Sequence, residues 1–493
     1  MTFFTSLSEY RRPTRKGSSV DLVAAPDYAG PVMGHVEPSS EAGTNRQGFL
    51  ARIGLRTPEH RAWAMYDWAN SAVILTIVTA IFPIFFVNYS SAGLAEGVAL
   101  QRYAWASALA LLIVAPLAPV LGAMADYGGF KKRFLGGFLA IGAGGAAGML
   151  FLRQGDWLTA LLLFTIVTVG AQGSFVFYES LLPHIARGHE MDRVSTAGYA
   201  LGYLGSSILL ALQILWIRNP ALLGLPTGSD LDPATASFPT RLAFLSVAVW
   251  WVAFSVPVFL RVREPAPLLE ADERPRRNPA RVALQRLRET FRELRRYRQA
   301  FLMLVAFLIY NDGIATIIKL SAIYGDDIGL GTQALIGAIF IAQLVGIPFA
   351  FLFGGLAGRF GAKRLILAGL VVYMGVSFCA YFLRTEAQFL ALAVVVGMVQ
   401  GGTQALSRSL FASLIPRHKS SEFFGFWSVL EKFAGVVGPA LFATVHGLTG
   451  ESRQAILSLI AFFVLGALLL TRVDVEAGRA AAREADRGLR PAG

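Results

Sequence analysis

Two short stretches of one pattern decide the fold of this chain. Residues 122–133 read GAMADYGGFKKR, and residues 354–364 read GGLAGRFGAKR. In each stretch a glycine is followed four positions later by Asp126 or Gly358, and then by a turn glycine and two adjacent basic residues. Each copy follows the second long apolar stretch of its half of the chain. A motif repeated at matched positions indicates two similar halves in the same orientation.

Twelve apolar stretches accompany these motifs, and each is long enough, at about twenty residues, to cross a ~30 Å hydrocarbon core as a helix. We expect the spans at 62–88, 102–125, 134–153, 157–180, 194–217, 241–260, 299–322, 332–357, 364–383, 387–412, 423–446 and 453–472. The predicted fold is an all-α membrane protein made of two parallel-repeated six-helix bundles. The predicted parts are an N-terminal tail (1–58), a first bundle (59–260), a central loop (261–298), a second bundle (299–472) and a C-terminal tail (473–493).

The composition excludes several classes of protein. Of 493 residues, 55% are hydrophobic and 15% are charged, and the mean hydropathy is +0.54. A soluble chain of this length would form several domains with charged surfaces. The single cysteine, Cys379, lies in an apolar run, so we expect neither disulfides nor a thiolate metal site. The six histidines lie in tails, loops or helix ends without a His-Glu-x-x-His motif, which argues against a metal centre and an enzyme.

The distribution of Lys and Arg predicts the orientation. Loops 126–133, 181–193, 261–298, 358–364 and 413–422 are much richer in basic residues than the alternate loops. Positive loops stay inside, so we expect both termini and the central loop in the cytoplasm of a bacterium, and a multi-pass protein in its cytoplasmic membrane. The net charge of +12 reports this asymmetry, and we expect no nucleic-acid partner.

The tails and the central loop differ in composition from the bundles. Residues 1–58 are rich in Ser, Pro, Gly and charge and are expected to be disordered, with Met33 left open as an alternative start. Residues 279–298 have an apolar stripe among arginines, which predicts a helix on the anionic inner leaflet or a solvated linker. The C-terminal tail is expected to be frayed.

The repeated loop motif has the residues of a gate. Gly122 permits a close helix approach, and Gly129 permits a tight turn. Asp126 is placed to interact with Lys131, Lys132 or Arg133 and with donors at a nearby helix end. An ionic latch of this kind can hold one face of the two bundles closed. In the second copy Gly358 stands where the acid is expected, so we predict an asymmetric latch. The alternative is that the basic residues are topological anchors. The second copy contributes Gly354, Gly361, Lys363 and Arg364 to the candidate gate.

Ionisable and amide side chains within apolar helices are costly, so they are candidates for solute binding or ion coupling. Helix 7 contains the candidate hardest to explain structurally, Asp312, about mid-membrane, with Lys319 too far along the helix for a tight pair. Asp312 is therefore expected to be partly unpaired in one state, and available to a proton or to the ammonium group of an amino-acid solute. A structural hydrogen bond is the alternative. The further candidates are Asp67, Asn70, Gln172, Asn311, Thr316, Lys319, Gln400, Gln404, Glu431 and Lys432, with Glu179 and Arg408 as a polar pair near the inner surface.

The two halves, with the loop motif in both, resemble the major facilitator superfamily over residues 62–472. Four strings narrow the resemblance: YDWANS at 66–71, YNDG at 310–313, QGGTQALSRS at 400–409 and FFGF at 423–426. They look like the bacterial relatives of the autophagy-related vacuolar amino-acid effluxers. The resemblance implies alternating access, a central cavity lined by helices 1, 4, 7 and 10, and export of amino acids.

The leading hypothesis is a monomeric secondary transporter of a small polar solute, with an amino acid and export favoured. The chain has no Gly-x-x-x-x-Gly-Lys loop for ATP, so a proton gradient, a sodium gradient or the solute gradient would drive it. No cofactor is expected. Two alternatives stay open, namely a transporter of sugars, drugs or other metabolites, and a membrane sensor or scaffold that does not transport.

Overall fold

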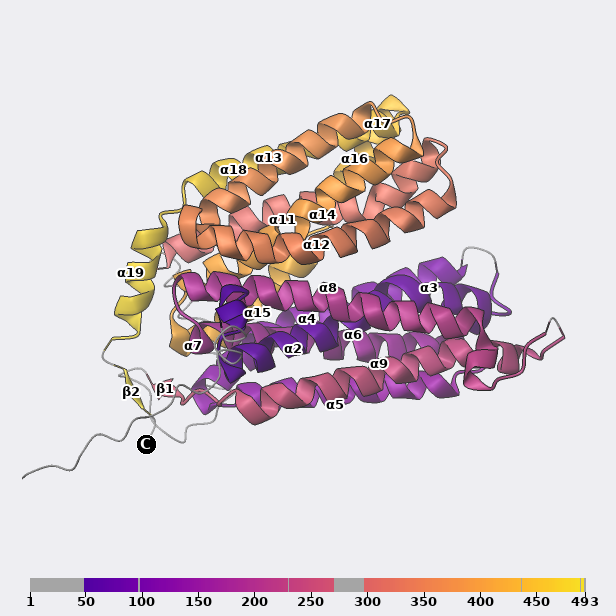
Figure 1. Ribbon diagram of the computed structural model, residues 1–493, viewed down its shortest axis with the longest axis horizontal. Helices are drawn as coiled ribbons and strands as arrows, with labels where there is room; N and C mark the ends of the chain where they lie inside the picture. Colours follow the sequence, from indigo (N-terminus) through magenta and orange to yellow (C-terminus); the bar gives the residue numbers. More distant parts are fainter. Residues whose placement is uncertain are drawn as a thin grey trace, which may run out of the picture. The chain divides into compact units, whose positions relative to one another are not determined.

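The computed structural model describes residues 48–95, 98–228, 230–269, 297–435, 437–487 and 489–491. Most of the N-terminal tail and the predicted lipid-binding helix at 279–298 lie outside these residues, apart from 297–298. The side chain of Lys432 also lies outside the description. The described chain is almost entirely helical (Figure 1).

The first bundle follows the predicted order of six spans, with two π-helical segments in the first span. Its elements are α2 (Pro58–Val73), η1 (Ile74–Ala80), α3 (Ile81–Phe85), η2 (Phe86–Ser90), α4 (Val98–Gly128), α5 (Lys131–Gly148), η3 (Met149–Phe151), α6 (Trp157–Ser180), α7 (Leu182–Ile185), α8 (His189–Arg218), η4 (Pro220–Leu223) and α9 (Pro233–Arg261).

The second bundle repeats this order and ends in an additional helix. Its elements are β1 (Leu268–Leu269), α11 (Arg298–Asp327), α12 (Thr332–Phe360), α13 (Ala362–Tyr381), α14 (Glu386–Leu414), η6 (Arg417–Lys419), α15 (Ser420–Phe433), α16 (Val437–Thr449), α17 (Ser452–Ser458), α18 (Ile460–Thr471), α19 (Val475–Ala485) and β2 (Arg490–Pro491). The two-residue strands β1 and β2 pair antiparallel.

Eleven helices among the described residues are long and apolar enough to cross a membrane. The remaining expected span, 423–446, is not one continuous helix, and this corrects the prediction. It is divided into α15 with 14 residues and α16 with 13. At 1.5 Å per residue each half is only about 20 Å long, so the two halves must cross a bilayer together. The interruption at Ala434 and Gly435 can be tolerated inside a membrane because the freed backbone groups have partners in the protein.

Helix starts have side chains that satisfy exposed backbone N–H groups. Thr57 accepts a hydrogen bond from the His60 N–H, and Pro58 occupies the first turn of α2. Asp232 accepts from the Thr235 N–H in the same way at α9. Thr385 and Gln388 form a capping box at α14. The polar residues that flank the apolar runs therefore set where the spans begin.

Small residues bring corresponding helices close together in both halves. A side chain on Gly202 of α8 would collide with Ser71 on α2. A side chain on Gly438 of α16 would collide with Thr316 on α11. The same helix pair, first with fifth, is thus tightly packed in each bundle, in agreement with the parallel repeat.

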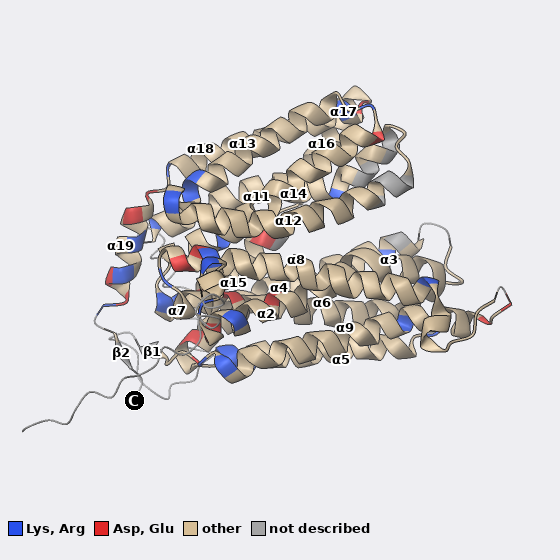
Figure 2. Ribbon diagram, viewed as in Figure 1, with Lys and Arg blue, Asp and Glu red and all other residues tan. Residues whose placement is uncertain are grey.

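The two ends of the bundles differ in charge. We call the end at which α2 begins and α18 ends the terminal end, and the opposite one the far end. Figure 2 shows many of the Lys and Arg residues gathered at the terminal end, around α7, α15 and α19. Elements of both bundles meet at this end, where α4 packs against α15 and α7 against α14.

The C-terminal tail is ordered over α19, so the expectation of a frayed end is wrong. Gly478 packs against Leu414 and Gln299, and Asp474 caps the helix through the Ala477 N–H. Beyond the helix, Asp486 accepts hydrogen bonds from the backbone N–H groups of Arg417 (3.1 Å) and His418 (3.5 Å). An apolar stripe hidden among the charges of the tail lets it pack on α14.

Candidate functional site

A cavity of about 410 Å³ lies between the two bundles. The first bundle lines it from α2, η1, α6 and α8, and the second from α11 to α15 and α17. It extends from Asp67 and Arg408 to Leu383 and Phe389, which lie near the far-end start of α14. A site that touches both bundles changes its access when the bundles move relative to each other.

Arg408 forms the charged floor of the cavity. Its side chain belongs to α14 and is 1% exposed. Its Nη1 and Nη2 each lie 3.2 Å from Asp67 Oδ2 on α2, and Nη1 lies 3.8 Å from Glu179 Oε1 on α6. Nε donates to Ser195 Oγ and Nη2 to the Ser195 carbonyl, both at 2.9 Å. One guanidinium group of the second bundle therefore holds three helices of the first.

Aromatic rings surround this guanidinium group. The Trp63 and Tyr199 rings lie 4.8 and 4.6 Å from Arg408 Cζ, and Tyr178 lies at 5.8 Å. Tyr178 also donates its hydroxyl to Asp67 Oδ2 at 2.8 Å. Ring faces attract cations, most strongly where water is excluded. The floor is thus built for positive charge.

The walls above the floor are mixed. Predicted Gln172, Gln400 and Gln404 line the cavity, as does Glu431. Ser71, Thr79, Tyr203, Ser206 and Gln343 add polar groups, while much of the remaining wall is aliphatic or aromatic, including Ile74, Phe175, Ile317, Ile339, Val396 and Ile456. Apolar walls with a few placed polar groups are typical of small-molecule sites.

Asp312 does not line this cavity in the described state, and backbone groups bind its carboxylate there. Asp312 is buried, and its Oδ1 accepts hydrogen bonds from the N–H groups of Gly435 (2.6 Å) and Gly438 (3.0 Å). These groups lie at the break before α16, where Gly435 has a φ of 86°. A carboxylate is favourable at a helix N-terminus, so Asp312 caps the second half of the broken span.

The other predicted residues on α2 and α11 also lie outside the cavity lining. Asn70 points toward α6, 3.4 Å from the Ala171 carbonyl and from Ser174 Oγ. Thr316 donates to the Asp312 carbonyl, and Lys319 donates to the Gly435 carbonyl at 3.4 Å. Asn311 is buried. These four side chains therefore lie at contacts between or within helices and do not line the cavity.

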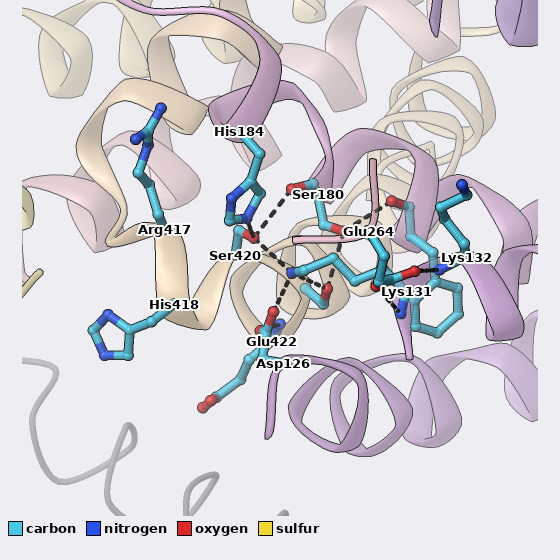
Figure 3. Close-up of polar contacts among 12 residues, drawn as sticks. Asp126, Lys131, Lys132, Ser180, His184, Glu264, Arg417, His418, Ser420 and Glu422 are labelled. Carbon is cyan, nitrogen blue, oxygen red and sulfur yellow. Dashed lines mark hydrogen bonds and ion pairs between the residues drawn. The ribbon is translucent and has the colours of Figure 1, made fainter. Parts of the chain in front are cut away.

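The first loop motif joins the bundles at the terminal end (Figure 3). Asp126 Oδ2 accepts from the Glu422 N–H at 2.9 Å, in the first turn of α15. Asp126 Oδ1 pairs with Lys131 Nζ, which also donates to Ser420 Oγ (2.9 Å) and Ser421 Oγ (2.7 Å). We call Asp126, Lys131 and residues 420–422 the latch. It combines a buried ion pair with a capped helix, and it spans both bundles.

The two glycines of the first motif permit close packing, Gly122 against the second bundle, and Lys132 acts within the first bundle. Gly129 has a φ of 64°, which a side chain would strain, and Gly122 leaves room for the Ser421 carbonyl. Lys132 Nζ donates to the Phe259 and Val262 carbonyls, both at 2.7 Å, at the end of α9.

Glu264 holds the start of α5. Its two carboxylate oxygens accept the N–H groups of Lys131 (2.9 Å) and Lys132 (2.8 Å). Burial raises the pKa of the Glu264 carboxyl group, although these two N–H groups and the lysine charges oppose the rise.

The second motif has the same glycine turn, but it has no acidic residue that could form a latch with the other bundle. Gly361 has a φ of 82°, and Lys363 Nζ donates to the Thr471 and Val473 carbonyls at the end of α18. Arg364 is exposed. Gly354 packs against Thr196 of α8. A side chain on Gly358 would lie 3.6 Å from Arg193 Nη2, so the position that lacks the acid faces a cation of the other bundle.

Comparisons with known proteins agree with this architecture. The sequence profile of the family described as "Vacuole effluxer Atg22 like" matches residues 101–483. The chain belongs to this Atg22-like family. It is 38% identical over 426 residues to an uncharacterized MFS-type transporter of Bacillus subtilis, covering 85% of this chain and 96% of that protein. It is 27% identical over 319 residues to autophagy-related protein 22 of Yarrowia lipolytica, covering 59% of this chain and 52% of that protein.

Solved structures show the fold of this Atg22-like protein. The major facilitator transporter FucP in its outward conformation superposes with a TM-score of 0.63 at 12% identity, covering 84% of this chain and 98% of FucP. A bacterial homologue of the iron transporter ferroportin in an outward-facing state superposes with a TM-score of 0.59 at 16% identity, covering 84% of this chain and 99% of that protein. The protein is a multi-pass transporter of the major facilitator superfamily, and its relatives are not enzymes.

Several lining residues of the Atg22-like chain escaped the sequence reasoning. Tyr199 and Tyr203 lie on the fifth span, and Gln343 on the eighth, which the expected set of lining helices omitted. Tyr199 and Tyr203 follow Ser195 at helical spacing, which could have shown one polar face on α8. Ser195 accepts a hydrogen bond from Arg408, and no local sequence pattern predicts that contact.

Proposed function

We propose that the transported solute is an amino acid, bound in the cavity between the bundles. The observation that carries this proposal is the contrast between the cavity floor and its walls. The floor offers the carboxylates of Asp67 and Glu179, which suit an ammonium group, and the amides of Gln400 and Gln404 on the walls can donate to a carboxylate group. The walls offer aliphatic and aromatic surface to an apolar side chain.

The proposed direction follows from the charges. The positive-inside rule assigns the basic terminal end, with both termini, to the cytoplasm of a bacterium. The described state, with its latch formed and its cavity lined to the far end, is then outward-facing. The family description of its relatives as effluxers supports export. We propose that the protein works as a monomer and that a proton gradient drives it.

The test is transport by the purified full-length chain in proteoliposomes. A panel of labelled amino acids, sugars and peptides is offered in counterflow, in which unlabelled solute inside drives entry of the label without an ion gradient. We expect label to enter with apolar amino acids such as L-leucine. Counterflow with sugars alone would overturn the solute class. A folded protein without counterflow for any solute would favour the sensor or scaffold.

Lining variants sharpen the test. Gln404→Ala removes an amide that lines the cavity, and we expect it to raise the half-saturating concentration of L-leucine several-fold. Gln454→Ala is the matched control, because Gln454 lies at the far end and donates to Glu451, away from the cavity. Equal effects of both substitutions would contradict the assigned site.

A further inference from the structure

The two oxygens of the Asp67 carboxylate have different surroundings. Oδ2 lies within 3.2 Å of both Nη atoms of Arg408 and accepts from the Tyr178 hydroxyl. Within the described part of the chain, no group donates to Oδ1. Oδ1 is not fully buried, and Asp67 lines the cavity, so Oδ1 can be reached from the cavity. One face of the carboxylate is therefore neutralised by protein, while the other is open to whatever enters the cavity.

The counter-charge of Asp67 comes from the opposite bundle. Asp67 belongs to α2, and Arg408 belongs to α14. Opening of the terminal end requires the first bundle to part from the second, which pulls Arg408 away from Asp67. A buried carboxylate without a counter-charge is costly. Another positive charge must replace Arg408 before the end can open.

The other charged and titratable groups around Asp67 come from four helices. Helix α6 presents Glu179 and Tyr178, α8 presents Tyr199 and Tyr203, and α15 presents Glu431. On α2 itself the titratable neighbour is Tyr66. Arg408 is the cation that touches Asp67 among the described side chains.

We propose that Asp67 is the coupling residue of an antiporter, at which Arg408, a proton and the ammonium group of the solute compete for one carboxylate. This rests on the proposed function, since it takes an amino acid as the solute. In the outward-facing state Arg408 occupies Asp67 and expels the previous occupant into the cavity. The chain returns to the inward-facing state only when a cation from the cavity has displaced Arg408.

The cycle accounts for every proton. A hydronium ion in the outward cavity gives its proton to Asp67, so an O–H bond forms and Arg408 is released. After the terminal end opens, the proton leaves to cytoplasmic water and the ammonium group of the solute takes its place. The terminal end then closes, Arg408 displaces the ammonium group, and the solute leaves outward. One proton enters for each solute exported.

The experiment measures solute and proton movement together. Proteoliposomes hold labelled L-leucine and a pH-sensitive dye, and an inward proton gradient is imposed. We expect faster L-leucine efflux together with proton entry in the wild type. Asp67→Asn is expected to lose both. Asp232→Asn is the matched control, because Asp232 caps α9 at the far end, and it is expected to behave as the wild type.

The sign of the Arg408 effect separates competition from structural support. Arg408→Gln removes the internal competitor, so L-leucine should bind several-fold more tightly and leave more slowly. Arg408→Lys keeps the charge but loses hydrogen bonds to Ser195 and Asp67, so it should tighten binding less than Arg408→Gln does. If Arg408 only supports the fold, both variants weaken binding. Weaker binding in Arg408→Gln, or efflux without proton entry in a wild type that still performs counterflow, would overturn the coupling proposal. Failure of counterflow itself would instead refute the proposed solute.

Discussion

The two copies of the glycine-rich loop have the same backbone and different contacts across the bundles. Both make their turn at a glycine with positive φ, Gly129 and Gly361, and both use a lysine to cap the last helix of their bundle. The first copy adds Asp126, which binds α15 of the other bundle. The second copy has Gly358 at that position, beside Arg193. The turn and the anchor are therefore separable from the latch.

This difference shows where the energy of closure lies. Asp126 and Lys131 both belong to the first bundle, and their contacts with residues 420–422 of the second bundle form only while the terminal end is closed. At the matching position of the second copy, Gly358 lies beside Arg193, so a cation is present and the acid is missing. We infer that the balance between the two transport states depends mainly on one carboxylate, and the following predictions address that balance.

Asp126→Asn is expected to have the largest effect. It leaves Lys131 buried without a counter-charge in the closed state only, at a cost of about 3–5 kcal/mol. Transport should slow, and the inward-open population should rise, while folding and membrane insertion change little. Reactivity of a cysteine placed in the cavity toward a membrane-impermeant reagent from each side measures the shift. Unaltered labelling would leave only the anchor function of the motif.

Gly358→Asp is expected to act in the opposite direction with a smaller effect. The new carboxylate would pair with Arg193, which is partly exposed, so we expect a gain of about 1 kcal/mol for the closed state. Gly358→Asn is the matched control, since it adds similar bulk and no charge. The same cysteine assay applies. An equal shift in both variants would show a steric effect and refute the ion pair.

Asp312→Asn is expected to cost stability without changing the balance. Asp312 caps α16 from within its own bundle, whereas Asp126 caps α15 from the opposite bundle. Loss of a helix cap costs about 1 kcal/mol. A lower midpoint of thermal unfolding with unchanged cavity labelling and intact counterflow is the expected result. Loss of L-leucine binding would instead return Asp312 to the solute site that the sequence suggested.

The pH dependence of Glu264 is expected to be the smallest effect. Its pKa is raised in the folded protein, so the folded state holds this proton more tightly than the unfolded one. The contribution of Glu264 to stability is therefore largest in acid and decreases as the pH rises from the ordinary Glu value through the raised value. The midpoint of thermal unfolding of the wild type should therefore fall relative to that of Glu264→Gln as the pH rises from 4 to 7. A constant difference between the two midpoints over this range would contradict the prediction.

The sequence predicted what depends on period and repeat. The apolar stretches, the two loop motifs and the basic loops are local patterns, and they were enough for the superfamily fold. The break in the eleventh span was missed because FAGVVGPALF at 433–442 is apolar, and glycine and proline are tolerated in membrane helices. Only Asp312, more than a hundred residues away, shows that the break is capped.

The candidate site was predicted by residue type more than by place. Asp67, Glu179 and Arg408 could be chosen as costly charges in apolar helices, but nothing in their local sequence brings them together. Conversely, Asp312 satisfied the same rule and proved to be a helix cap. Tyr199 was missed because an aromatic residue in an apolar helix is unremarkable without its neighbours. The tertiary contacts decide which polar residues face the cavity.

The asymmetry of the two loops is tested most directly by distances across the terminal end. Spin labels at Arg187 of the first bundle and Arg359 of the second, both exposed, are introduced in a Cys379→Ser background and measured by pulsed electron paramagnetic resonance. Asp126→Asn is predicted to shift the distance distribution toward the longer, open component, and Gly358→Asp toward the shorter, closed one. Unchanged distributions in Asp126→Asn, or a shift of both variants in the same direction, would contradict the account.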